Sequence, residues 1–343
     1  MKTKHILYLI AVLILVLSSC REITITTKVN KDGSFTRIVR ITGDSSEVLQ
    51  TDLPFPVNDT WAKTIEKDTS VIGGFVVTYT KSYRNSDELN EEIASDTSWQ
   101  RSLNREISVT RKFGFFYSYL KFRQVVQAAN PFDSLNYKDF LTREDLLWIS
   151  GMKPVINSAD SSRKDEADDK ADLYFTQTMA VEIESMLAEG IRRLNIEDLK
   201  PEDVSLYHDS IAVILENSKF TLPDIIERYS RWTGRAEVMK MNDLIPPPLE
   251  GLDEKMEILL RILLMDEYVQ VVEMPGLITA TNSIALNGNQ VRWQFIPVTV
   301  LFEGYEIYVE SRVINIWAFV VSGLVILALI SIVLKNVFRQ SKP

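Results

Sequence analysis

His208, Asp209 and Ser210 supply, in three consecutive positions, the residue types of a serine hydrolase triad. In such a triad the histidine takes a proton from the serine, and the carboxylate orients the imidazole. Neighbouring residues on a helix point about 100° apart, so these three side chains cannot form that relay among themselves. The chain also lacks the G-x-S-x-G, H-E-x-x-H, Walker and G-x-G-x-x-G motifs. We therefore predict a protein that is not an enzyme, and a hydrolase with an unfamiliar site remains an alternative.

A second kind of chemistry is the covalent attachment of lipid, for which Cys20, the only cysteine in the chain, is well placed. It follows Leu17, Ser18 and Ser19, and this order of an aliphatic residue, two small residues and a cysteine resembles the bacterial lipobox. Small side chains let a peptidase approach the bond before the cysteine, and the thiol is the atom that receives diacylglycerol. The alternative is a small apolar cysteine that ends an uncleaved signal anchor. We predict a lipoprotein with lipid, including palmitate, attached at Cys20.

The residues before Cys20 have the order of a signal peptide. Lys2 and Lys4 precede an uncharged run from Ile6 to Leu17. A helix of that length reaches only about 18 Å, against roughly 30 Å of bilayer hydrocarbon. The run is too short for a stable span, so we predict that residues 1–19 are a lipoprotein signal peptide.

A second apolar segment, residues 313–334, contains no charged residue over 22 positions. As a helix it would be about 33 Å long, which is enough to cross a bilayer. Trp317 lies near one end, and basic residues follow the other end: Lys335, Arg339 and Lys342. Cytoplasmic flanks of membrane spans carry an excess of lysine and arginine. We therefore predict a transmembrane helix in the bacterial inner membrane, a cytoplasmic tail at 335–343, and a periplasmic body.

The charge balance of the body disfavours polyanionic partners. Five of the 38 basic side chains flank the two apolar segments, which leaves 33 basic against 47 acidic side chains, a balance of −14. Such a body repels phosphate backbones and anionic headgroups. We predict no nucleic-acid partner and no attachment to the membrane through a polybasic segment.

Composition also bears on metals and cofactors. One cysteine and two histidines, His5 and His208, cannot supply a disulfide framework or a Cys/His zinc site. The acidic run 158–172 lacks the alternating ligands and the central glycine of an EF-hand loop. We predict no metal ion and no cofactor.

Alternating apolar and polar residues predict strands near both ends of the chain. Asp32-Gly33 between two such runs is a hairpin signal, because glycine readily adopts the positive φ of the turn. A second hairpin is predicted around Lys112-Phe113-Gly114. The predicted strands cover 23–29, 35–41, 74–83, both arms of 107–126, 267–273, 277–286, 291–295 and 298–309.

Helical periodicity dominates the middle of the chain. Phe175, Met179 and Ile183 begin a series of apolar residues spaced by three and four, which predicts one face of a long helix. Residues 158–172 are charged and small, without apolar anchors, and are predicted to be an exposed loop. The predicted helices cover 59–67, 87–94, 137–149, 175–194, 201–217, 223–232 and 252–264.

These elements predict an α+β fold with one antiparallel sheet formed from both chain ends, a helical insertion and one C-terminal transmembrane helix. The sheet would bring the two membrane anchors near one another. Its two ends would then lie within roughly 10 Å of the headgroups. The predicted parts are the signal peptide 1–19, a β-rich part 20–130, a helical insertion 131–265, a β part 266–312 that completes the sheet, the transmembrane helix 313–334 and the tail 335–343.

Both chain ends resemble a known family. "CREITITTKVNKDGSFTRIVRI" combines a cysteine, a strand, a Lys-Asp-Gly turn and a second strand. "EMPGLITATNSIALNGNQVRWQF" has Pro-Gly and then a strand centred on Trp293, and a terminal apolar helix follows. Together these segments resemble the LppM-type bacterial envelope lipoproteins. The resemblance implies an envelope protein with a mixed α/β ectodomain for which lipid or glycolipid binding has been proposed.

Three functions are compatible with these observations. The first is a non-catalytic envelope lipoprotein, tethered to the inner membrane at both ends, that binds a lipid, a glycan or a protein at the periplasmic surface. The second is an assembly partner of another envelope protein, which would dock on the amphipathic helices at 175–194 or 252–264. The third is a hydrolase with an unrecognised site. An exposed apolar patch on the helices would favour a protein partner, and an apolar cavity inside the sheet would favour a lipid.

Overall fold

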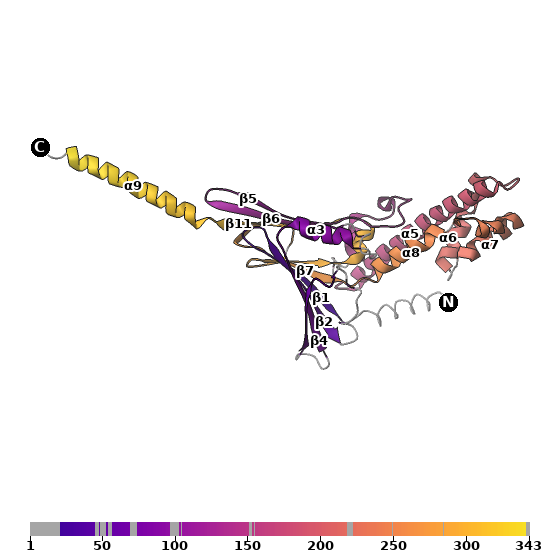
Figure 1. The fold of residues 1–343 in the computed structure, drawn as a ribbon. Coiled ribbons are helices and arrows are strands. Elements are labelled where there is room, and N and C mark those ends of the chain that lie inside the picture. The colour runs from indigo at the N-terminus through magenta and orange to yellow at the C-terminus, as the bar shows by residue number, and fades with distance from the viewer. Residues whose placement is uncertain are drawn as a thin grey trace. The chain divides into compact units, whose positions relative to one another are not determined.

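The structure is a computed structural model that describes residues 21–44, 48, 53, 57–68, 74–96, 103, 105–150, 153, 155–217, 222–248, 250–283 and 285–340. The chain divides into two compact units, which Figure 1 shows as ribbons. In the β unit the described residues lie within 21–126, 267–295 and 306–340, and in the helical unit they lie within 127–266 and 296–305. Signal peptide 1–19 and Cys20 lie outside the described residues.

The described strands of the β unit form two sheets rather than the one predicted, and each sheet takes strands from both ends of the chain, as predicted. The seven-stranded sheet has the order β3-β4-β2-β1-β7-β10-β9, and the four-stranded sheet has the order β5-β6-β11-β8. The first sheet contains β1 (Glu22–Val29), β2 (Phe35–Asp44), β3 (Ala62–Asp68), β4 (Gly74–Tyr83), β7 (Tyr268–Glu273), β9 (Ala285–Asn287) and β10 (Gln290–Phe295). The second contains β5 (Arg105–Phe113), β6 (Tyr117–Val126), β8 (Leu277–Thr281) and β11 (Tyr305–Ile314).

Side-chain alternation explains the core of the β unit. Ile23, Ile25 and Val39 point to one face of the first sheet and are at most 2% exposed. Rings of Tyr268 and Phe295 stack on the same face at 4.6 Å. Burial of each such side chain stabilises the fold by about 1.5–3 kcal/mol. The alternating apolar pattern therefore determines which face of each strand is buried.

One buried charge joins the two sheets. Arg37 of β2 is fully buried, and its Nη2 donates to Oε1 of Gln124 on β6 at 3.4 Å. Burial disfavours the charged guanidinium and lowers the pKa of Arg37 to about 10. Arg37 therefore stays protonated at neutral pH.

The strand directions correct one prediction. β1 and β7 are parallel, with Ile23 beside Tyr268 and Lys28 beside Glu273. The chain leaves β7 towards Gly276, where an added Cβ would lie 2.3 Å from the carbonyl oxygen of Arg312, near the C-terminal end of β11. β1 therefore starts at the end of the sheets away from the C-terminal helix. The prediction that this fold brings the two anchors near one another was wrong, because β1 pairs with β7 in parallel.

Two further predictions were wrong because tertiary pairing overrides local pattern. Residues 59–67 were predicted to be helical, but Ala62–Asp68 form the edge strand β3 along β4. Residues 298–309 were predicted to be one strand. Instead, Pro297–Leu301 form a 3-10 turn, and β11 starts at Tyr305.

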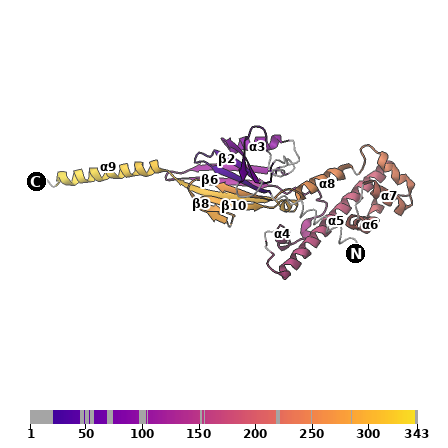
Figure 2. The ribbon, with the colours of Figure 1, turned by 90° about the horizontal axis from the view of Figure 1, so that it is seen from below.

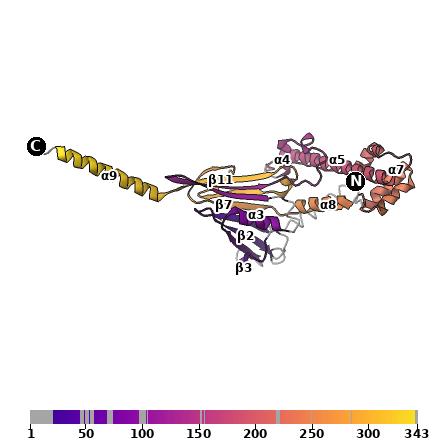
Figure 3. The same ribbon diagram turned by 45° about the horizontal axis from the view of Figure 1, so that its top comes forward.

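A partly buried carboxylate, that of Glu92, fixes α3 (Ser86–Ser95) to the strands, and Figure 3 shows this helix beside the sheets. Glu92 accepts hydrogen bonds from Lys81 Nζ at 2.7 Å, Tyr83 Oη at 2.9 Å and Trp61 Nε1 at 2.8 Å. Burial alone would raise the pKa of Glu92, but these donors outweigh it, and the pKa is lowered. The ionised carboxylate therefore stabilises the folded β unit.

We predict that Glu92→Gln removes part of the acid sensitivity of the fold. A carboxyl whose pKa is lowered by folding stabilises the folded state at every pH above its pKa in the unfolded chain, which is about 4.5. This stabilisation is lost as the pH falls through the lower pKa of the folded state. The free energy of unfolding should fall below about pH 4.5 less steeply in the variant than in the wild type, as measured by urea unfolding. Glu91→Gln, at an exposed neighbour, is the matched control. Identical pH profiles for wild type and Glu92→Gln would contradict the prediction.

The helical unit is formed around one long helix (Figure 2). Helix α5 (Ser158–Leu194) starts at the N-cap Asn157, which accepts from the backbone N–H of Asp160, and ends at Asn195 with φ 49°. The other described α-helices of the unit are α4 (Arg143–Ile149), α6 (His208–Asn217), α7 (Leu222–Thr233) and α8 (Glu250–Leu263).

The first half of α5 corrects the prediction of an exposed loop at 158–172. Ala167 and Ala171 are buried there, and Lys170 pairs with Asp145 of α4 at 2.9 Å. Alanine packs closely and has the highest helix propensity, so this stretch needs no large apolar side chains to form a helix. In its second half, Ile183, Leu187 and Ile191 are buried as predicted for one apolar face.

Candidate membrane-interface site

Helix α9 (Ile316–Gln340) is long and apolar enough to cross a membrane. Its stretch Ile316–Leu334 has a mean hydropathy of 2.8, and 6% of it is buried in the structure. Nineteen residues make about 28 Å of helix, close to the hydrocarbon thickness of a bilayer. The predicted start at Val313 was wrong, since Val313 and Ile314 still belong to β11. The strand continues to this point because the inward side chain of Val313 is still buried in the core.

The tip of the β5–β6 hairpin carries three exposed phenylalanines. Phe113, Phe115 and Phe116 are 60%, 49% and 41% exposed. Gly114 is needed between them, because a Cβ there would lie 2.6 Å from the carbonyl oxygen of Tyr117. This turn therefore presents large apolar side chains that the β unit itself does not bury.

Asn315, the one residue between β11 and α9, bonds to this hairpin tip. Its backbone N–H donates to the carbonyl of Phe116 at 2.9 Å. Its side-chain amide donates to the carbonyls of Gly114 at 2.7 Å and Phe115 at 3.2 Å. Its Oδ1 accepts from Ser118 Oγ at 3.1 Å. Four hydrogen bonds thus hold the strand–helix junction against the hairpin.

Aromatic rings from the hairpin and from the first turn of α9 pack together around this junction. Trp317 stacks on Phe113 at 6.2 Å and meets Phe115 edge-on at 5.2 Å. Phe319 lies 4.9 Å from Phe116. Such contacts add about 0.5–1.5 kcal/mol each beyond burial, so the start of α9 is held rigidly to the sheet. We call Phe113, Phe115, Phe116, Trp317 and Phe319 the aromatic collar.

The position of the aromatic collar matches a membrane interface. Tryptophan gathers at the level of the headgroups, because its ring is apolar and its indole N–H is polar, and Trp317 of the collar is of this type. The collar lies at the first turn of an apolar helix of spanning length. The arrangement can therefore place one end of the second sheet at the surface of a bilayer.

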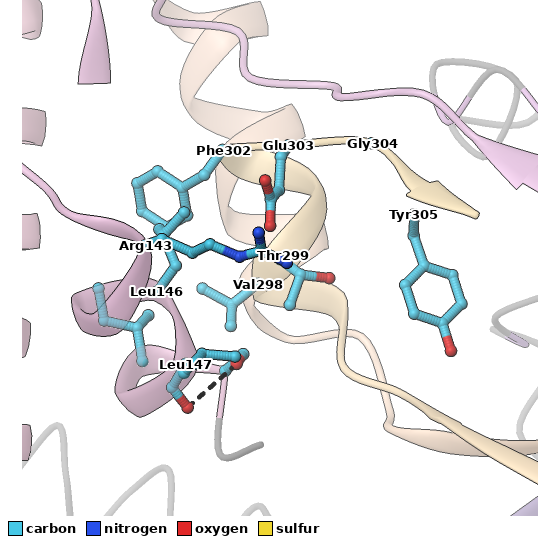
Figure 4. Close-up of a pocket in the computed structure, with 11 residues that line it drawn as sticks. Arg143, Leu146, Leu147, Val298, Thr299, Phe302, Glu303, Gly304 and Tyr305 are labelled. Atoms are coloured by element: carbon cyan, nitrogen blue, oxygen red, sulfur yellow. Dashed lines mark hydrogen bonds between the residues drawn. The ribbon is translucent and has the colours of Figure 1, made fainter. Parts of the chain in front are cut away.

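The helical unit contains a separate small pocket of about 120 Å³ between α4 and the turn Pro297–Leu301 (Figure 4). Leu146, Val298 and Phe302 form apolar walls, while the exposed side chains of Arg143 and Glu303 lie at its rim. The lining residues include a hydroxyl, Ser150, which donates to the carbonyl of Leu147 at 3.3 Å. They include neither histidine nor cysteine, and their one carboxylate, Glu303, is exposed at the rim.

His208, Asp209 and Ser210 do not form a catalytic triad in the structure. His208 at the start of α6 lies between two residues of α5: its Nδ1 is 2.5 Å from Glu184 Oε1, and its Nε2 is 2.6 Å from Gln177 Oε1. Neither contact involves a nucleophile. His208 therefore connects α6 to α5.

The predicted site residue, Cys20, lies outside the described residues, so lipid attachment there stays a prediction. Sequence reasoning missed Asn315 and, although it named Trp317 and Phe113 separately, it did not predict that they pack together in the aromatic collar. The sequence did contain a signal for the collar: three phenylalanines lie within four residues at a predicted hairpin turn. Exposed turns are usually polar, so large apolar side chains there indicate a contact surface. No sequence signal identifies Asn315, since its partners are about 200 residues away.

The fold and this site define an α+β protein with one apolar C-terminal helix long enough to cross a membrane. No known protein family matches the chain, and no curated protein matches it. A solved structure, that of the folded domain of LppM from Mycobacterium tuberculosis, is similar at a TM-score of 0.29 with 8% identity. The likeness covers 87% of this chain and 92% of that domain.

Proposed function

We propose that this chain is a non-catalytic envelope protein whose β unit is held at the periplasmic surface of the bacterial inner membrane by α9. The carrying observation is the junction: β11 ends at Ile314, α9 starts at Ile316, and Asn315 between them bonds to the hairpin. A flexible stalk would allow the ectodomain to move away from the membrane. A bonded single-residue junction instead keeps the sheet at a constant distance from the bilayer.

A lipid on Cys20 would be the second tether. Cys20 precedes Glu22, where β1 begins, by two residues or about 7 Å of extended chain. β1 starts at the end of the sheets away from α9, so its length of about 26 Å separates the two anchors. A lipid on Cys20 would therefore hold the β unit at the end opposite to α9.

A second candidate partner is a protein that docks on the helical unit. Leu260, Leu263 and Leu264 form an apolar i, i+3, i+4 stripe at the end of α8 that is 49%, 49% and 65% exposed. The other predicted docking helix, 175–194, buries its apolar face inside the unit. The envelope assembly partner therefore remains the second candidate function, with α8 as its docking surface.

The membrane-surface proposal predicts different depths for two exposed apolar positions of the β unit. A fluorophore attached to a cysteine at Phe116 should be quenched by lipids with brominated acyl chains in nanodiscs that hold the full chain. The same fluorophore at Ile65, which is 51% exposed on edge strand β3, should not be quenched. Equal quenching at both positions, or none at Phe116, would show that the hairpin does not mark the membrane end.

A further inference from the structure

The outer face of the second sheet carries its charges in an uneven pattern along the strands. Away from α9, cations are neutralised: Arg123 pairs with Glu306 at 2.7 Å, and Lys121 pairs with Glu310 at 2.9 Å. These pairs link β6 and β11 across the sheet. They leave little net charge on this part of the surface.

Beside the aromatic collar the pattern changes. Lys112 is paired in register with Tyr119, and the guanidinium of Arg312 lies 5.2 Å from the centre of the Tyr117 ring. Arg312 is also paired with Leu277 of β8. Among the described residues, neither Lys112 nor Arg312 has a carboxylate within 4.0 Å. We call Lys112, Tyr117, Tyr119, Leu277 and Arg312 the headgroup patch.

The headgroup patch is exposed and amphipathic. Lys112 and Arg312 are exposed, Tyr119 is 47% exposed and Leu277 is 59% exposed. Two cations alternate with two phenols and one aliphatic side chain. Lysine and arginine can attract phosphate charge there, while tyrosine rings and the leucine lie at the boundary with the acyl chains.

We propose that the headgroup patch binds the headgroups of anionic phospholipids. Three observations support this occupant: unpaired cations are confined to the end of the sheet next to α9, they are interleaved with tyrosines, and the patch continues into the aromatic collar. The net acidity of the body predicted repulsion from anionic headgroups. Segregation of charge along the sheet overcomes that repulsion locally, because charges beyond about 8 Å are largely screened at physiological salt. The proposal rests on the proposed function, since it requires α9 to hold the patch at the membrane.

The test uses the full chain in nanodiscs that contain phosphatidylcholine and phosphatidylglycerol. Each lipid in turn is supplied as an analogue with a photoactivatable headgroup, and labelled peptides are identified by mass spectrometry. The phosphatidylglycerol analogue should label peptides of the headgroup patch about 25-fold more than the phosphatidylcholine analogue, which is about fivefold for each of the two cations. Lys112→Gln and Arg312→Gln should each reduce that preference by about fivefold, the share of one surface cation.

Arg123→Gln is the matched control, because it removes one cation from the same face at a site where a carboxylate already neutralises it. It should leave the preference unchanged. A second measurement needs no variant: with the wild-type chain, raising ionic strength from about 0.05 M to about 0.5 M should abolish most of the preference.

Equal labelling by both analogues would overturn the headgroup proposal. So would a preference for phosphatidylglycerol that persists at high salt and in the variant with both Lys112→Gln and Arg312→Gln. Labelling of α9 by an analogue photoactivatable in its acyl chain reports on the proposed function separately. If α9 is labelled and the patch shows no preference, only the headgroup proposal fails. If α9 is not labelled, the membrane-surface function fails as well.

Discussion

Disabling both anchors should release the protein from membranes, whereas disabling either one should not. Val325→Arg together with Leu329→Arg places two charges in the middle of α9, at positions that are 53% and 57% exposed and make little contact with the β unit. Each arginine at the centre of a span costs about 2.5–3.5 kcal/mol, so the pair should lower insertion of α9 by more than about a thousandfold. Lipid on Cys20 would still hold this variant, because several acyl chains anchor a protein stably.

The measurement is the distribution of protein between membrane and soluble fractions after an alkaline carbonate wash. The Cys20→Ser variant should remain in the membrane through α9. The triple variant, which combines Cys20→Ser with Val325→Arg and Leu329→Arg, should become almost entirely soluble. Ile316→Arg is the control, since an arginine at the interface end of a span costs far less than one at its centre. A triple variant that resists the wash would show that a third element holds the chain. Release of the α9 variant with Cys20 intact would argue against lipid attachment.

Asn315→Ala should detach the start of α9 from the hairpin without unfolding the sheet. The change removes the three side-chain hydrogen bonds to Gly114, Phe115 and Ser118 and leaves the backbone bond to Phe116. At about 0.5–1.5 kcal/mol for each of the three bonds, the loss is about 1.5–4.5 kcal/mol. Spin labels at Tyr119 and Leu324 should give one narrow distance distribution in the wild type. In Asn315→Ala the distribution should broaden.

Asn282 offers a matched control elsewhere in the β unit. It also makes three side-chain hydrogen bonds, to Glu306, Trp293 and Tyr308. Asn282→Ala should therefore lower the free energy of unfolding by a similar amount while leaving the hairpin–helix distance narrow. If both variants broaden the distribution equally, the effect is general destabilisation rather than loss of the junction.

Local chemistry was sufficient for much of the fold. Asp32-Gly33 was predicted to be a turn, and Gly33 has φ 95° with Asn30 and Ser34 closing the hairpin. The strand predicted at 74–83 matches β4, since alternating β-branched and aromatic residues favour a strand wherever it pairs. The apolar helix at the C-terminus is evident from hydropathy alone, because length and the absence of charge do not depend on neighbours.

Features that depend on distant partners were not predictable from local pattern. The direction of β1 relative to β7 follows from pairing between residues more than 240 positions apart, and it decides that β1 starts away from α9. The strand β3 and the first half of α5 likewise obtain their stability from neighbours rather than from their own apolar periodicity.

The sequence by itself determined that this chain has an apolar C-terminal helix and strands at both ends of an α+β body. Lipid attachment at Cys20 stays a prediction from the sequence. Only the tertiary structure decided that Asn315 bonds to a hairpin 200 residues earlier and that the unpaired cations gather beside the aromatic collar. Hydropathy and turn chemistry act over a few residues, so they can be read along the chain. Hydrogen bonds and charge pairing across a sheet depend on register, which the packing of the whole β unit sets.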